Sequence, residues 1–268
     1  MPPELPASNL NRELEEAGSI RRFAYSFLEG EHKGDFRRED YIALILFNRC
    51  LQTHEATEIL VRHSLIDDAW ALIRALAEHA VNCAYMLMVA DAQIANDFSD
   101  YPKYRRYKEL LYLKKTNEDL LRKTVTAEQE ETMRTQFEAV RSRFDGKHGD
   151  RWCPDEKLYK RAARVDERIT EAAGEKRDDF QWLVNFVWGH VSAYVHGAAN
   201  VLAQQVTGIA DGVRIQRKYT FEEAAQALFS ANLALYVALL PVDQLLGGKN
   251  VEELKGRFAE WSARSLGC

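Results

Sequence analysis

The sequence contains few residues that break helices: 14 glycines and 6 prolines among 268 residues. Between them, long stretches place apolar side chains three and four positions apart, which is the periodicity of a helix. Alternation of apolar and polar residues, typical of a half-buried strand, occurs only from Gly208 to Tyr219. The sequence therefore predicts an all-α protein, a multi-helix bundle with at most one short hairpin.

Cysteine is also scarce, and the four thiols of Cys50, Cys83, Cys153 and Cys268 lie far apart, without the short spacings of a metal site. No apolar run reaches the roughly 18 residues of a membrane-spanning helix. The longest is Leu233 to Pro241 with its neighbours. The first residues lack the pattern of a signal peptide. We therefore expect a cytoplasmic protein with reduced thiols that needs neither a membrane, a metal nor a cofactor.

A large charge of one sign is absent as well, because the net charge is −5. Such a chain has no general attraction for phosphate or anionic lipid, so any contact with nucleic acid has to be local. The one basic zone, Tyr101 to Lys115, interleaves tyrosines with lysines and arginines. It either follows RNA through phosphate contacts and stacking, or is a solvated helix face with its aromatic rings turned inward. The second case is the more common.

The order of helical segments predicts one domain, residues 1–268, without a linker or an internal repeat. Its core is expected from about 36–90 and 178–246. A charged helical insertion, about 91–175, is expected to protrude, and an amphipathic helix follows at 251–265.

Several residues mark expected helix ends. Pro102 is expected to interrupt a helix, Asp35 to cap a helix over 36–63, and a mostly polar helix from Asn9 to Glu29 to pack on the outside of the bundle. Two pairs have the spacing of a capping box that opens a helix: Thr126 with Gln129, and Thr220 with Glu223.

The helix expected from Ile66 to Val89 has two neighbouring faces. One is an apolar stripe typical of a core, and the other is polar and bordered by large apolar residues, which indicates partial burial. The polar face consists of Arg74, Glu78, Asn82 and Tyr85.

A second polar row is expected on a helix from Asp179 to Val206. The row lets another helix approach closely and offers amide, hydroxyl and imidazole groups to Arg74 or Glu78, whereas His190 and Tyr194 point to another side. Its members, spaced four, three, four and four residues apart, are Asn185, Gly189, Ser192, His196 and Asn200.

The run ALIRALAEHAVNCAYML, preceded by RHSLIDDAW and followed much later by HVSAYVHG, resembles the uncharacterised bacterial family called domain of unknown function 5677. The resemblance covers roughly residues 36–245. It implies that Arg74 and Glu78 on one helix, with Ser192 and His196 on a later one, are the positions of interest. It implies no reaction.

A wider resemblance is to HEPN domains, helical bundles that often act as metal-independent ribonucleases in toxin and phage-defence systems. Their motif places an arginine four to six residues before a histidine on a late helix of a dimer; here His190 stands at the arginine position and His196 follows. The resemblance implies a homodimer that cleaves RNA or binds a nucleotide. Chemically, His196 fits the role of base, His190 that of acid, and Arg74 that of the cation. Binding residues are expected at Asn82, Tyr85, His190, Tyr194 and Asn200.

The alternative is a non-enzymatic interaction module or small-ligand binder, in which Ser192 and His196 hydrogen-bond Glu78 and Asn82 and only hold the helices in register. A di-iron bundle is disfavoured because Glu-x-x-His spacing occurs only at Glu29 to His32. A serine hydrolase is disfavoured because Ser192 has no glycine elbow. A single metal ion on a histidine and Glu78 stays open.

Overall fold

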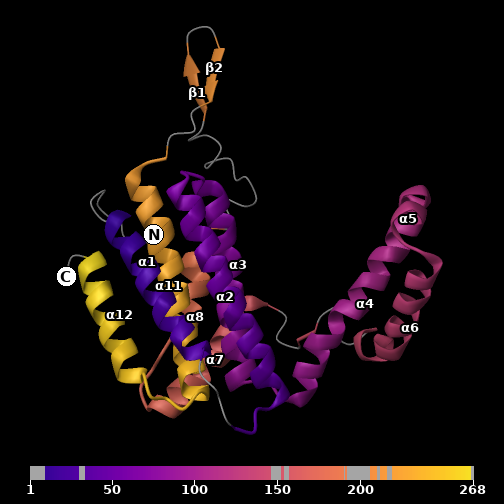
Figure 1. Ribbon diagram of the computed structural model, residues 1–268, viewed down its shortest axis with the longest axis horizontal. Helices are drawn as coiled ribbons and strands as arrows, with labels where there is room; N and C mark the ends of the chain where they lie inside the picture. The colour runs from indigo at the N-terminus through magenta and orange to yellow at the C-terminus, as the bar shows by residue number, and fades with distance from the viewer. Residues whose placement is uncertain are drawn as a thin grey trace. The chain divides into compact units, whose positions relative to one another are not determined.

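The protein is an all-α bundle of several helices, as predicted (Figure 1). The structure is a computed structural model that describes residues 10–29, 34–145, 152–153, 157–189, 191, 206–209, 212–215 and 219–266. Its helices follow the order α1 (Leu10–Leu28), α2 (Arg38–Arg62), α3 (Ile66–Met88), α4 (Ala92–Thr116), α5 (Glu118–Thr124), α6 (Ala127–Phe144), α7 (Leu158–Ala173), α8 (Asp179–Trp182), the π-helix η2 (Leu183–Trp188), α11 (Phe221–Leu245) and α12 (Val251–Leu266).

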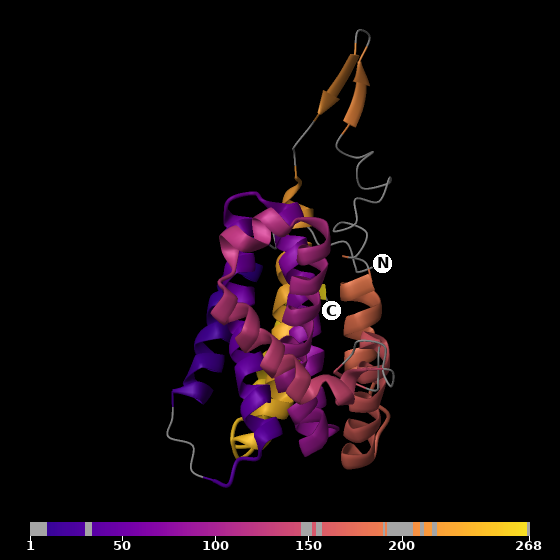
Figure 2. The same cartoon turned by 90° about the vertical axis from the view of Figure 1, so that its right-hand side faces the viewer.

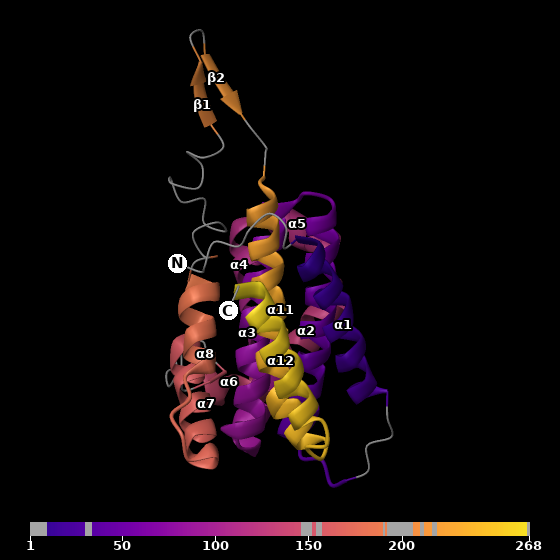
Figure 3. The same cartoon turned by 90° about the vertical axis from the view of Figure 1, so that its left-hand side faces the viewer.

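Two compact units divide the chain: Met1–Val89 with Leu158–Cys268, and Ala90–Lys157. In the larger unit, α2 and α3 form a helical hairpin, against which α11 packs. Helix α1 covers α11 and α2, and α12 lies along α11 (Figure 3). Helix α7 packs against α3, with α8 beside it (Figure 2). The larger unit is therefore built around α3 and α11.

Several large apolar residues of α2 face solvent, although apolar residues usually lie on the side that faces the core. Tyr41, Ile45 and Ile59 are 57%, 64% and 51% exposed, whereas Phe47 and His54 are fully buried. The N-cap of the helix is Arg37, whose backbone N–H donates to the Asp40 carboxylate over 2.8 Å. Asp35 is therefore not the cap. The exposure of the three apolar residues arises because tertiary packing buries one face among several that hold apolar residues.

Helix α1 packs on α11 and α2, and its inner face is buried against them. Ala17, Ile20 and Ala24 are at most 1% exposed, and Glu13 is fully buried between them and the bundle. A buried carboxylate requires hydrogen-bond donors. Two polar residues of this helix, Glu13 and Glu16, are therefore part of the interior.

Helix α11 is the most apolar element and lies in the centre of the larger unit. It is long and apolar enough to cross a membrane by composition alone, contrary to the expectation from the sequence, but most of it is buried against the other helices. That burial is what the core helix of a soluble protein shows. Its start is the expected capping box, in which Thr220 and Glu223 exchange hydrogen bonds of 3.2 and 2.8 Å. Pro241 lies inside the helix.

The smaller unit has a core of its own. Tyr104, Phe137, Val140 and Phe144 are at most 5% exposed and hold α4 against α6. Helix α4 runs through Pro102, so the expected interruption is wrong. The capping box of Thr126 opens α6 as predicted.

The expected hairpin is present, with β1 (Val206–Ile209) antiparallel to β2 (Gly212–Ile215) and Gly208 opposite Val213. No other strand occurs within the ranges described. Strand structure is thus confined to one pair of four-residue strands.

Candidate functional site

Arg74 lies on α3 against the π-helix. Its guanidinium carbon is 4.8 Å from the centre of the Trp188 ring, the distance of a cation–π contact. Trp188 is the last residue of η2, and π-helical turns are frequent at functional sites because they shift side chains out of helical register. The contact therefore places Arg74 directly beside Trp188, after which the chain continues to Ser192 and His196.

The polar face of α3 is divided between solvent and core. Glu78 is exposed and makes neither a hydrogen bond nor an ion pair with the described residues. One turn further, Asn82 is 6% exposed and its Oδ1 accepts no hydrogen bond from the described part of the chain. Tyr85 is 1% exposed. Burial thus differs along the face: Arg74 is half-buried, Glu78 is accessible, and the last two residues lie within the bundle.

The beginning of the polar row is not buried. Asn185 and Gly189 are exposed, whereas Val184 and Val191 are buried. The i to i+5 bonding of η2 explains the difference, because it changes the rotation per residue on which the expected row depended. The remaining predicted residues lie outside the described part of the chain: His190, Ser192, Tyr194, His196 and Asn200.

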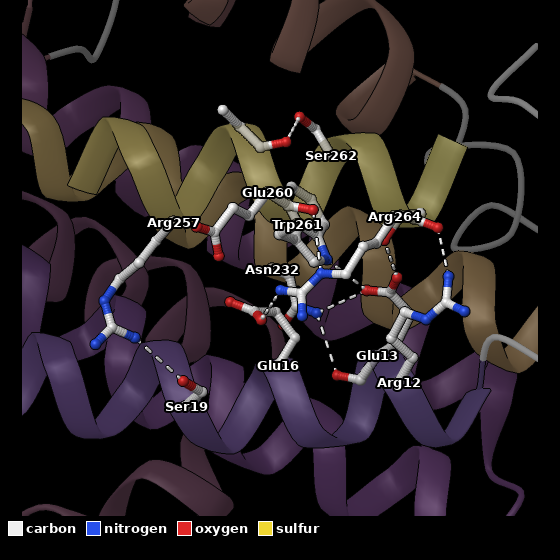
Figure 4. A network of polar contacts seen from close by, with 12 residues as sticks. Arg12, Glu13, Glu16, Ser19, Asn232, Arg257, Glu260, Trp261, Ser262 and Arg264 are labelled. Carbon is white, nitrogen blue, oxygen red and sulfur yellow. Dashed lines mark hydrogen bonds and ion pairs between the residues drawn. The ribbon is translucent and has the colours of Figure 1, made fainter. Parts of the chain in front are cut away.

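A buried polar network that the sequence analysis missed joins α1, α2, α11 and α12. Its centre is Asn232 on α11, whose amide nitrogen donates to Glu13 Oε2 over 2.9 Å. Its amide oxygen lies 2.9 Å from His54 Nε2. Trp261 of α12 also donates to the Glu13 carboxylate, over 3.0 Å (Figure 4). Ser265 of the same helix donates to it over 2.5 Å. A single carboxylate thus collects donors from two helices.

The network fixes the protonation of its members. Because the Asn232 amide nitrogen faces a carboxylate, its oxygen faces His54, which therefore carries its proton on Nε2. Burial lowers the pKa of His54 to about 4, although the Asn232 hydrogen bond raises it. Burial raises the pKa of Glu13, opposed by its three side-chain donors. A neutral imidazole is thus held in one tautomer.

The network continues toward the surface through α1 and α2. Arg21 lies 3.2 Å from His54 Nδ1 and 2.6 Å from Glu58. Arg62 adds a second pair of 2.6 Å to Glu58. Burial alone would raise the pKa of Glu58, but hydrogen bonds from Arg62 and Arg21 lower it. The sequence does contain a signal for this network: Asn232 is a lone amide within an otherwise apolar stretch of α11.

A charged cleft of about 320 Å³ lies on the outer side of the network, between α1 and α12. Arg257 donates to the Ser19 hydroxyl over 3.3 Å, and Arg12 donates to the backbone carbonyl of Arg264 (Figure 4). Tyr236 donates to Glu16 over 2.6 Å at the edge of this cleft, and burial raises the pKa of that phenol. The cleft is held together by groups that already bind one another.

Metal ligands do not converge in the described ranges, where no three histidine, cysteine, aspartate or glutamate side chains are grouped for an ion. Burial lowers the pKa of His79, against the effect of Glu78 beside it. Cys50, Cys83 and Cys153 are buried free thiols. On the α3 face, Glu78 is exposed and the buried Asn82 Oδ1 has no hydrogen-bond donor among the described residues.

The α3 face and the segment after Trp188 both lie in the part of the chain, residues 40–211, that matches the family of unknown function DUF5677. The chain belongs to this family. No curated protein and no solved structure matches the chain. The DUF5677 match contains Arg74, Glu78, Ser192 and His196, whereas Glu13, Asn232 and Trp261 lie outside it.

Proposed function

We propose that this protein of the DUF5677 family is a HEPN-like helical protein of bacterial defence or stress response that cleaves RNA without a metal or binds a nucleotide. The observation that carries the proposal is the contact of the Arg74 guanidinium, 4.8 Å from the centre of the Trp188 ring, at the start of the segment with His190, Ser192 and His196. An arginine guanidinium binds phosphate with two donors, and stacking on an aromatic ring holds the guanidinium plane in place.

The proposed reaction is transfer within the RNA chain. His196 takes the proton of a 2′-hydroxyl, whose oxygen attacks the adjacent phosphorus. The bond from phosphorus to the 5′-oxygen breaks, and His190 gives a proton to that oxygen. Arg74 stabilises the charge of the phosphorane. The products are a 2′,3′-cyclic phosphate and a 5′-hydroxyl, and no metal takes part.

The other polar groups have supporting roles in this proposal. The exposed Glu78 carboxylate accepts a hydrogen bond from a ligand hydroxyl or from the Ser192 hydroxyl. The Asn82 amide oxygen, which lacks a donor among the described residues, is available to the same cluster. Tyr194 and Asn200 complete the binding surface, and the buried Tyr85 supports it from within the bundle. A homodimer is part of the proposal, since HEPN sites form at a dimer axis.

Labelled single-stranded RNA incubated with the protein in excess EDTA tests the proposal. We expect Arg74→Gln to lower the cleavage rate by about a hundredfold or more, as for loss of a transition-state donor. The matched control is Arg164→Gln, which removes an exposed arginine of α7 whose ion pair among the described residues is with Glu167. It is expected to leave the rate unchanged.

His196→Ala and His196→Asn separate the two interpretations of the polar row. If both variants melt at the wild-type temperature and lose cleavage, the catalytic role stands. A wild-type protein that neither cleaves RNA nor binds a nucleotide, while His196→Ala loses its fold and His196→Asn retains it, establishes the alternative: an interaction module whose polar row is structural. Cleavage that persists in His196→Ala is a contaminant and also excludes the enzyme.

A further inference from the structure

Two adjoining hollows of about 330 and 280 Å³ lie between α8, α11 and α12. Figure 3 shows α8 to the left of α11 and α12 in front of α11. Residues of α11 line both hollows. Asp179, Val237 and Phe258 line both hollows, so they are one continuous groove. Its size is within the range of small-molecule sites, about 300–1,000 Å³. The groove is outside the site around Arg74 and does not depend on its function.

Aromatic rings form the walls of the first hollow. Trp261 is fixed because its indole N–H is bound to Glu13, and its ring stacks on Phe229 at 4.8 Å. Phe258 packs against Trp261 at 5.7 Å and is nevertheless 37% exposed at the rim. Trp182, stacked on Phe186 at 5.0 Å, forms the opposite wall from α8. Rigid, partly exposed rings are surfaces on which another flat ring stacks at little cost in entropy.

The two hollows differ in charge, although Asp179 lines both and pairs with Arg177 over 2.9 Å. Asp178 and Asp179 line the first hollow, where no basic residue is present among the lining groups. Asp178 is exposed and makes no ion pair with the described residues. Arg177 and Lys255 line the second hollow. Lys255 pairs with Glu252 over 3.1 Å in an exposed pair, which contributes little and exchanges readily for a ligand anion.

We propose that this groove binds a guanine nucleotide. The base stacks against Trp182 and Phe258 in the first hollow, and the phosphate lies in the second near Arg177 and Lys255. An ionised carboxylate only accepts hydrogen bonds. Asp178 therefore selects guanine, whose N1–H and 2-amino group are adjacent donors, over adenine, which presents an acceptor at N1.

Titration of the full-length protein with GMP, guanosine and AMP tests the assignment, with tryptophan fluorescence and calorimetry as readouts. Both are suitable because Trp182 and Trp261 line the groove. We expect saturable binding of GMP, and about tenfold weaker binding in Phe258→Ala, since a base stacked on an aromatic ring is worth about that factor or more. The matched control is Phe221→Ala, which removes a 66% exposed ring of α11 outside the groove.

Two further variants test the ends of the ligand. Asp178→Asn is expected to reduce the preference for GMP over AMP at least tenfold. Lys255→Gln is expected to weaken GMP but not guanosine. Each result supports the assigned orientation.

Three results would overturn the proposal: no saturable binding of GMP at about 1 mM, equal affinity for AMP and GMP in the wild type, or GMP binding that Phe258→Ala leaves unchanged. Sedimentation that shows a dimer dissociated by Phe258→Ala would assign the groove to a second copy of the chain instead. None of these outcomes bears on RNA cleavage by Arg74, so the groove proposal and the cleavage proposal fail separately.

Discussion

The imidazole Nε2 of His54 on α2 lies 2.9 Å from the amide oxygen of Asn232 on α11, with both side chains fully buried. The contact joins residues 178 positions apart in the sequence. Because the Asn232 amide nitrogen is bound to Glu13, the amide has one orientation and the imidazole one tautomer. The centre of the bundle is thus specified by hydrogen-bond direction as well as by apolar packing.

The first prediction concerns stability and pH. The folded state keeps His54 neutral down to a pKa of about 4, whereas an unfolded chain protonates it near the usual 6.5. Between these values the unfolded state binds more protons, so the free energy of unfolding falls as pH falls. The loss should be about 2 kcal/mol between about pH 7 and pH 5, measured by urea denaturation.

His54→Gln provides the control for this prediction, because glutamine donates to Asn232 without titrating. The raised pKa of Glu13 acts in the opposite direction but is common to both proteins, so the difference isolates His54. An equally steep decline in both proteins contradicts the assignment.

A second prediction concerns the amide itself. Asn232→Leu removes one donor from the buried Glu13 carboxylate and the acceptor for His54, and we expect a loss of about 2–4 kcal/mol because both partners stay buried. Gln226→Leu is the matched control on the same helix, since Gln226 is half-buried and forms no hydrogen bond with the described residues. Chemical denaturation of the two variants gives the comparison. Equal stability would show that water or rearrangement satisfies the network.

The helices were predictable because their signals are local. The capping boxes of Thr126 and Thr220 predicted the exact residues at which α6 and α11 begin. Gly174 follows α7 with a φ of 72°, a conformation that favours glycine. The apolar stripe of α3 is likewise buried. Local signals fix where a helix lies along the chain, but not which side of it the other helices cover.

The interior network was not predictable by the same means. The burial of Glu13 depends on donors from α11 and α12, more than 200 residues later in the chain. Periodicity did not mark Glu13 as buried, because polar residues usually face solvent. In the candidate site, Arg74 was selected from its sequence context, but its cation–π contact requires the π-helical turn at Trp188, for which the sequence pattern gave no sign.

A third prediction concerns the start of α8. Asp166 on α7 accepts the backbone N–H of Phe180 over 3.0 Å and that of Gln181 over 2.8 Å, so a neighbouring helix supplies the cap. Asp166→Ala leaves two amides without an acceptor and is expected to cost about 1–2 kcal/mol. Glu167→Ala, which removes only an exposed pair with Arg164, should cost less than about 0.5 kcal/mol. Equal midpoints in thermal melts would contradict the capping role.

The last prediction concerns the thiols. Cys50 and Cys83 are fully buried, and Cys153 is 2% exposed. Burial raises the pKa of Cys50 and of Cys83, so neither forms the reactive thiolate near neutral pH. In a Cys268→Ser variant we therefore expect no reaction with an aromatic disulfide reagent at about pH 8 within minutes, and reaction of three thiols per chain after denaturation in guanidinium.

If Cys153 alone reacts in the native protein, the smaller unit opens more readily than the α2–α3 pair, because Cys50 and Cys83 become reactive only when those two helices separate. Rapid reaction of Cys50 or Cys83 without denaturant would contradict the packing of α2 on α3, where Cys83 Sγ donates to the Ala43 carbonyl over 3.3 Å.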